Sequence, residues 1–181
     1  DGLPHRLLSG QTSFSGAVSA AQKALDSPEL ILEPATSRAW ASGEPVDLPP
    51  AEFAFYWWLA ERCRQGQHPL HWDDPGNAAT FLDHYRRCVG EMSGDYERLD
   101  GALQAGMDRA YFERRCSRVN RYLREALGPA LAARYSVQGL TRRPRTRYGL
   151  DLPPEAIRLR VAGLASAPAT EIGADGDQQE E

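Results

Sequence analysis

Arginine is the residue type whose distribution in this sequence most clearly indicates a chemistry. The chain has 181 residues and a net charge of −4, but residues 105–160 carry 13 basic and 5 acidic side chains, a net of +8. Guanidinium groups form charge-assisted hydrogen bonds with phosphates, so a cluster of them indicates a polyanionic partner. A contact with a partner protein and a solvated basic surface are the two other interpretations. The candidate nucleic-acid-binding residues are Arg114, Arg115, Arg118, Arg121, Arg142, Arg143, Arg145 and Arg147.

One pair of residues has the spacing of a catalytic motif. Five residues separate Arg62 from His68, and an arginine followed by four to six residues and a histidine resembles the motif of HEPN-type ribonucleases. Cys63 stands where that motif usually has a polar residue, and Gly66 predicts that the helix ends before His68. We therefore expect no catalytic residue in this chain, and keep a ribonuclease that uses Arg62 and His68 as the alternative.

Other side chains that could bind a metal or act as a nucleophile lack a suitable arrangement. His68 and His71 fall in a loop and do not have the i, i+4 spacing that places two ligands on one helix face. Ser117 is flanked by arginines and has no histidine or acid at helical spacing. We expect neither a metal nor a cofactor. A metal site would have to be formed by His68, His71, Asp73, Asp74 and His84.

Cysteine usage and hydropathy exclude further classes of protein. The three cysteines form no Cys-x-x-Cys pair, and Cys88 and Cys116 fall on apolar stripes, which is typical of unreactive buried thiols in a reducing compartment. No apolar run approaches the roughly 20 residues of a membrane span. We expect a cytoplasmic protein without a membrane segment. The first residue is not Met, and we interpret the sequence as a piece of a longer protein.

The elements that must position the arginines follow in a definite order. Apolar runs between turn residues predict a small antiparallel sheet, and longer periodic stretches predict helices. Pro50 suits the first position of a helix, and Asn77 and Asp108 are the expected caps of two later ones. The predicted order is strands at 30–32, 38–40 and 46–48, helices at 51–65, 78–92, 96–107 and 109–127, and a hairpin at 137–152.

The helix predicted over 109–127 has two chemically different faces, and Gly128-Pro129 ends its regular part. Its apolar stripe falls within about 60° on a helical wheel and comprises Phe112, Cys116, Val119 and Leu123. The opposite side carries Arg114, Arg118 and Arg121. The sequence therefore predicts a helix that packs with one face and presents guanidinium groups with the other.

Two groups of apolar residues are candidates for an interface. One recurs at spacings of 4, 3 and 4, which predicts a stripe on a short helix that docks on the domain or pairs with a second copy: Phe14, Val18, Ala21 and Leu25. The other is the aromatic run at 53–58, which spans more than one helix face. We interpret part of this run as core and assign Trp57 and Trp58 to an interface with another element or chain.

The order of the elements resembles a winged helix-turn-helix. The segment from Gly43 to Ala60 (Gly-x-x-Val-x-Leu-Pro-Pro-x-Glu-Phe) resembles the sheet-to-helix entry of the response-regulator type. In such a domain the helix at 109–127 would hold the recognition position, with its arginines toward phosphates or base edges, and the hairpin at 137–152 would be the wing. The insertion at 66–95 is longer than that type normally carries.

A second resemblance covers roughly residues 1–158. Its motifs include Gly2-Leu3-Pro4, Leu48-Pro49-Pro50-x-Glu52-Phe53-Ala54, Ser117-Arg118-Val119-Asn120-Arg121 and Tyr148-Gly149-Leu150. Together they resemble the C-terminal region of a CRISPR-associated family whose members begin with a CARF domain, a Rossmann-like sensor of cyclic oligoadenylate in type III CRISPR defence, described as a ring nuclease. The resemblance implies that the sensor lies outside this chain, and that any ring-nuclease activity belongs to the sensor.

We therefore expect an α+β protein in three parts: a linker and amphipathic helix at 1–28, a mostly helical winged-helix-like domain at 29–160, and an acidic disordered tail at 161–181. Its expected function is that of a nucleic-acid-binding and dimerisation module of a CARF protein in antiviral defence. The expected partners are DNA or RNA, a CARF sensor domain and a second copy of the chain. A HEPN-like ribonuclease half of the same kind of protein is the alternative.

Overall fold

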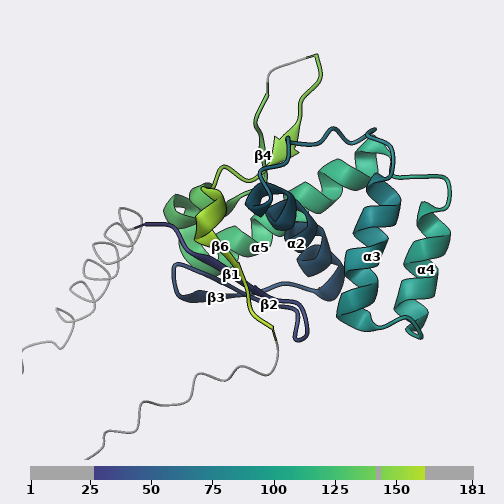
Figure 1. Cartoon of the computed structure of the whole chain (residues 1–181), viewed down its shortest axis with the longest axis horizontal. Helices are drawn as coiled ribbons and strands as arrows, with labels where there is room; N and C mark the ends of the chain where they lie inside the picture. Colours follow the sequence, from purple (N-terminus) through teal and green to yellow (C-terminus); the bar gives the residue numbers. More distant parts are fainter. Residues whose placement is uncertain (1–26, 142–143, 162–181) are drawn as a thin grey trace, which may run out of the picture.

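The described part of the chain, residues 27–141 and 144–161 of a computed structural model, folds around a small mixed sheet (Figure 1). Strands β1 (Leu30–Glu33), β2 (Arg38–Ala41) and β3 (Glu44–Asp47) form an antiparallel meander. Strand β6 (Ile157–Leu159) joins the other edge of β1 in parallel and gives the order β3-β2-β1-β6. The α+β class is thereby confirmed, whereas the prediction of a wholly antiparallel sheet is wrong.

The parallel strand arises because the chain returns to the edge that β1 leaves free. A short 3-10 helix, η1 (Pro154–Ala156), precedes β6 and leads the chain to this edge. An edge strand carries unpaired N–H and C=O groups, and β6 satisfies those of β1: Leu30 pairs with Ile157, and the Arg160 N–H donates to the Leu32 carbonyl at 2.7 Å. The sheet therefore joins the beginning and the end of the described domain.

In the described residues four α-helices follow the meander: α2 (Pro50–Arg64), α3 (Asn77–Val89), α4 (Gly94–Leu103) and α5 (Arg109–Tyr135). Pro50 is the first helical residue and Asp108 is the N-cap of α5, as predicted. Gly128 has a φ of 75° and interrupts α5, so the regular helix ends where the sequence indicates and a second helical segment continues to Tyr135. None of these described helices combines the length and the apolar character that a membrane span requires.

The expected capping role of Asn77 is wrong, because Gly76 occupies the N-cap position with a φ of 83°. Asn77 is instead the first residue of α3, and its side chain is buried. Its Nδ2 donates to the carbonyls of His71 and Trp72 at 2.9 and 3.0 Å. The amide therefore holds the long loop between α2 and α3 in place.

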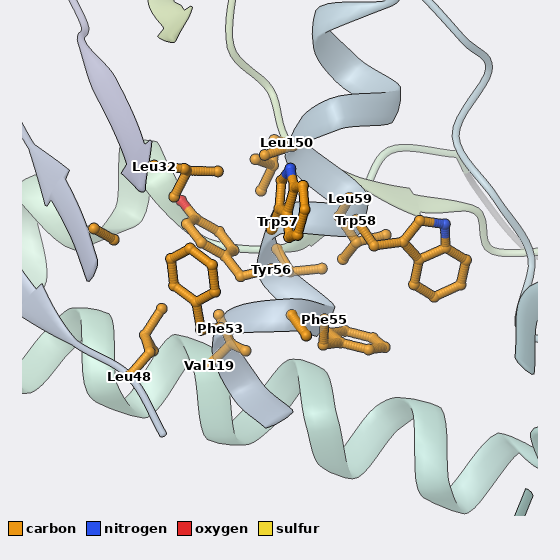
Figure 2. Close-up of a cluster of buried hydrophobic side chains, with 14 of the residues drawn as sticks. Leu32, Leu48, Phe53, Phe55, Tyr56, Trp57, Trp58, Leu59, Val119 and Leu150 are labelled. Carbon is orange, nitrogen blue, oxygen red and sulfur yellow. The ribbon is translucent and has the colours of Figure 1, made fainter. Parts of the chain in front are cut away.

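Helix α2 lies at the centre of the core, and every residue from Glu52 to Ala60 is buried. Figure 2 shows Phe53 on the side of Leu48 and Val119, whereas Trp58 leaves the opposite side of the helix. The Phe55 ring meets aromatic rings of both α3 and α5 in edge contacts, with centroid distances of 5.7 and 5.2 Å. The sheet, α3 and α5 thus surround α2 on all sides.

Trp57 and Trp58 belong to this core, which corrects their assignment to an interface. Only 4% of Trp57 and 1% of Trp58 is exposed. The Trp57 ring packs against the His84 imidazole at a centroid distance of 4.6 Å. A helix that is covered on all sides leaves no aromatic face for a second chain, and this is why the run at 53–58 can be continuous.

The predicted hairpin is present, and its ladder is short. Strands β4 (Gln138–Gly139) and β5 (Tyr148–Gly149) pair in antiparallel fashion and project from the rest of the molecule (Figure 1). Leu70, in the loop after α2, exchanges two backbone hydrogen bonds with Tyr148, at 3.1 and 2.7 Å. The hairpin is therefore attached at its base to the α2–α3 loop.

Candidate nucleic-acid interface

Helix α5 presents the candidate arginines because its opposite side is fixed in the core. Its apolar stripe is buried, and the Asp108 carboxylate accepts a hydrogen bond from the Tyr111 N–H at 2.6 Å. On the solvent side, Arg114, Arg118 and Arg121 recur at spacings of 4 and 3, which places them on one face. All three are exposed; the side-chain values are 45% for Arg118 and 54% for Arg121.

Arg124 extends this face, although the sequence analysis did not name it. It is exposed and follows Arg121 by three residues, a rotation of about 60° on the helix. A helical wheel continued for one further turn would have found it. The exposed arginines on this face of α5 are therefore Arg114, Arg118, Arg121 and Arg124.

The contacts of Arg114 and Arg121 within the chain are weak enough to be exchanged for a phosphate. Arg121 lies 3.6 Å from Glu125 and over the Tyr122 ring at 5.1 Å. Arg114 lies over the Tyr111 ring at 5.8 Å. Exposed ion pairs and cation–π contacts of this kind contribute about 1 kcal/mol or less.

Arg115 is not part of the exposed face, which corrects its assignment to nucleic-acid binding. Its side chain is 14% exposed, and its Nη1 donates to Glu52 Oε1 at 2.5 Å. Its Nε donates to the Tyr111 hydroxyl at 3.1 Å. Arg115 is rotated by about 100° from Arg114 on the helix, and this rotation directs it to α2. It forms a structural ion pair.

Glu52 holds two arginines through the same oxygen. Its side chain is 2% exposed, and Oε1 also lies 2.8 Å from Arg118 Nε in an ion pair. A buried carboxylate is costly unless cations pair with it, so Arg115 and Arg118 compensate its charge together. Arg118 is thereby held at Nε while nearly half of its side chain faces solvent. In the sequence, the only signal of this role is one acid directly before a buried aromatic run.

The hairpin is fixed beside the exposed face of α5 by side chains of the helix and of the α2–α3 loop. The Asn120 side-chain amide donates to the Val137 carbonyl at 2.9 Å and accepts from the Val137 N–H at 2.8 Å. Arg147 Nη1 donates to the Asp74 carboxylate at 3.1 Å and to the Pro69 carbonyl at 3.0 Å. Arg147 is therefore an anchor of the hairpin. Arg145 is exposed, whereas Arg142 and Arg143 lie outside the described residues.

Arg62 and His68 are in contact in the structure, but the contact is to the main chain of His68 and not to its imidazole ring. Arg62 Nη2 donates to the main-chain carbonyl of His68 at 2.8 Å, after the end of α2. Partial burial lowers the pKa of the Arg62 guanidinium. This contact closes the turn that follows α2, and it gives the His68 ring no partner for acid–base chemistry.

The remaining candidates for chemistry are accounted for by packing. Within residues 27–141 and 144–161, no three His, Cys, Asp or Glu side chains are grouped so that they could hold a metal ion. His84 is buried, with Nδ1 2.8 Å from the Thr80 carbonyl and Nε2 3.1 Å from the Glu61 carboxylate. Burial raises the pKa of Cys88 to about 11 and of Cys116 to about 12, so both are protonated thiols at neutral pH.

The stripe of Phe14, Val18, Ala21 and Leu25 lies outside the described residues. Comparison of the chain with protein-family models, with curated proteins and with solved structures finds no match. Function resides in the chemistry of sites rather than in fold class. The exposed arginines of α5 and the hairpin beside them are the features that bear on it here.

Proposed function

We propose that this domain binds duplex nucleic acid in the manner of a winged helix, with α5 as the recognition helix and the hairpin as the wing. The observation that carries the proposal is the row of four exposed arginines on α5, beside a hairpin that the same helix anchors through Asn120. The backbone pairing of Leu70 with the hairpin supports it further, because it ties the wing to the loop after α2.

The dimensions of α5 suit this role. From Arg109 to the kink at Gly128 the helix is about 28 Å long at 1.5 Å per residue. The major groove of B-DNA is about 12 Å wide and admits a helix of this kind. Arginines on the face that enters the groove contact phosphates or the acceptor edge of guanine.

The resemblance to CARF-family proteins supplies the context of the proposal. In that context the domain is the C-terminal module of a cytoplasmic CRISPR-associated protein, it acts beside a sensor of cyclic oligoadenylate, and it works as a homodimer. A HEPN-like ribonuclease remains the alternative function. Loss of RNA cleavage by the full protein on Arg62→Ala or His68→Ala would establish that alternative.

The binding proposal is tested by the salt dependence of affinity for a labelled duplex. Each phosphate contact contributes a slope of about −0.9 to a plot of log affinity against log salt. We expect Arg114→Glu with Arg121→Glu to weaken binding by at least about tenfold and to reduce the slope by about 2. Neither residue lies on the apolar stripe, so the melting temperature should not change.

A matched control reverses the charge of two arginines outside α5. Arg98 on α4 and Arg158 on β6 are 79% and 69% exposed and pair with surface acids. Arg98→Glu with Arg158→Glu should leave affinity within about twofold of the wild type. Equal weakening by the two double variants would show only an effect of net charge. A wild-type affinity that does not depend on salt would refute the proposal.

A further inference from the structure

A groove of about 580 Å³ lies at the base of the hairpin, where three segments meet. The α2–α3 loop contributes His71 and Trp72, the first turns of α5 contribute Arg109 and Glu113, and the hairpin contributes Thr146 and Tyr148. A groove of this volume is within the range of small-ligand sites. It combines three aromatic rings with one guanidinium and one carboxylate, which is the chemistry that recognises a base and its phosphate.

Hydrogen bonds and ring contacts hold the aromatic side chains of the groove in place. The His71 and Trp72 rings lie 5.2 Å apart, and His71 Nδ1 accepts from the Asp73 N–H at 3.2 Å. The Tyr148 ring packs on Phe112 at 5.2 Å, and its hydroxyl donates to Glu113 Oε1 at 3.2 Å. Burial, together with the neighbouring Glu113, raises the pKa of Tyr148, so the hydroxyl remains a donor at neutral pH.

The charged side chains of the groove keep binding capacity. Arg109 is 66% exposed and uses Nε to bond Glu113 Oε1 at 2.9 Å, which leaves its terminal nitrogens for a phosphate. Both hydrogen bonds that Glu113 makes within the described residues are to Oε1. Its Oε2 is therefore available to accept from an exocyclic amino group, and the side chain is 40% exposed.

We propose that this groove holds an unpaired nucleotide of the bound nucleic acid, with its base stacked on the aromatic side chains, its amino group on Glu113 and its phosphate on Arg109. The inference rests on the proposed duplex binding and goes beyond it, because it assigns a preference for duplexes that end in a single-stranded overhang. Glu113 lies about 80° from Arg121 on the helical wheel, so the groove borders the arginine face. A base that contains an amino group, such as adenine, is favoured over thymine.

The test compares three duplex probes with the full chain, namely a blunt hairpin duplex and the same duplex with a three-nucleotide dA or dT overhang, and uses free AMP as a competitor. Stacking of one base on aromatic side chains changes affinity by about 5-fold to 150-fold. We expect the dA overhang to bind about tenfold more tightly than the blunt duplex, and a dT overhang to bind more weakly than dA. AMP at millimolar concentration should abolish the difference if the groove also accepts a free nucleotide, and should leave it unchanged if the groove requires a strand.

Two variants probe the groove, and one serves as a control. Trp72→Ala should remove the overhang preference while leaving blunt-duplex affinity unchanged. Trp72 also packs against the core, so Glu113→Gln, which keeps the size of the side chain, provides a second variant. It should abolish the difference between the dA and dT overhangs. Trp40→Ala changes a partly exposed tryptophan on β2, outside the groove, and should affect neither quantity.

Failure of the groove and failure of the duplex proposal give different results. Equal wild-type affinities for blunt and overhang duplexes, with normal salt dependence, would overturn the groove and leave duplex binding intact. Absence of blunt-duplex binding, with Trp72-dependent binding of a short single strand, would overturn the duplex proposal and keep the groove. An overhang preference that survives both Trp72→Ala and Glu113→Gln would place the unpaired nucleotide elsewhere and overturn the assignment.

Discussion

The burial of the Glu52 carboxylate allows us to predict how much stability the domain loses when its charge is removed. Glu52→Gln keeps the size of the side chain and one acceptor oxygen but removes its charge, so Arg115 and Arg118 lose their counterion. Removal of one partner from a buried ion pair costs about 3–5 kcal/mol. Arg115 is 14% exposed, whereas Arg118 is 45% exposed and can be rehydrated. We therefore expect a loss near the lower limit, about 3 kcal/mol.

Thermal and urea unfolding followed by circular dichroism measure this loss. For a domain of this size about 3 kcal/mol corresponds to a fall in Tm of about 6–12 °C. The control is Glu125→Gln, whose partner Arg121 is 3.6 Å away and whose side chain is 62% exposed. This variant should change stability by about 0.5 kcal/mol or less.

A double-mutant cycle separates the ion pair from other effects of the substitution. Arg115→Met should also destabilise the domain, since it leaves Glu52 with Arg118 alone. In the double variant Glu52→Gln with Arg115→Met, the combined loss should be smaller than the sum of the two single losses, with a coupling of about 1–3 kcal/mol. If Glu52→Gln is no more destabilising than Glu125→Gln, or if the cycle shows no coupling, the account of Glu52 as a paired buried charge is wrong.

Three further predictions concern the cysteines and the two terminal segments. Burial raises the thiol pKa of Cys88 to about 11 and of Cys116 to about 12 from 9.0. Ellman's reagent should therefore react slowly with both in the native protein at pH 8, and stability should fall as the pH rises above 9, where only the unfolded chain ionises these thiols. Deletion after Arg160 removes five acidic residues that would compete with nucleic acid for the arginines, so it should tighten duplex binding at low salt with little change in Tm. Equal dissociation constants for the full and the truncated chain would show that the tail does not compete for the arginines. Val18→Asp should shift the chain toward monomer in light scattering; a monomeric wild type at high concentration would instead assign the stripe to packing within the chain.

Local periodicity explains how much of the fold could be predicted. The apolar stripe of the helix at 109–127, the start at Pro50 and the cap at Asp108 depend on residues within a few positions of one another, and all three agree with the structure. Strand β6 could not be predicted in this way, because a strand of three residues is too short to show a periodic pattern. Its partner strand also lies more than 120 positions earlier in the sequence. Asn77 shows the same limit: its amide serves the preceding loop rather than its own helix.

The site could be predicted in part for a similar reason. The exposed row of Arg114, Arg118 and Arg121 follows from helical geometry alone. The burial of Arg115 depends on Glu52, 63 positions away, and no wheel drawn for one helix contains that partner. The groove at the base of the hairpin combines side chains from three distant segments, so its residues had no common signal in the sequence.

The parallel pairing of β1 with β6 determines how the domain would respond to tension. The chain enters β1 at Leu30 and leaves β6 after Leu159, and the two strands run in the same direction. A force that pulls the segment before residue 27 away from the segment after residue 161 would therefore draw the strands past each other lengthwise. In that geometry the inter-strand hydrogen bonds, including the one from Arg160 to Leu32, are loaded together rather than broken one at a time. The β1–β6 edge would thus act as a mechanical clamp against tension between the two flanking segments.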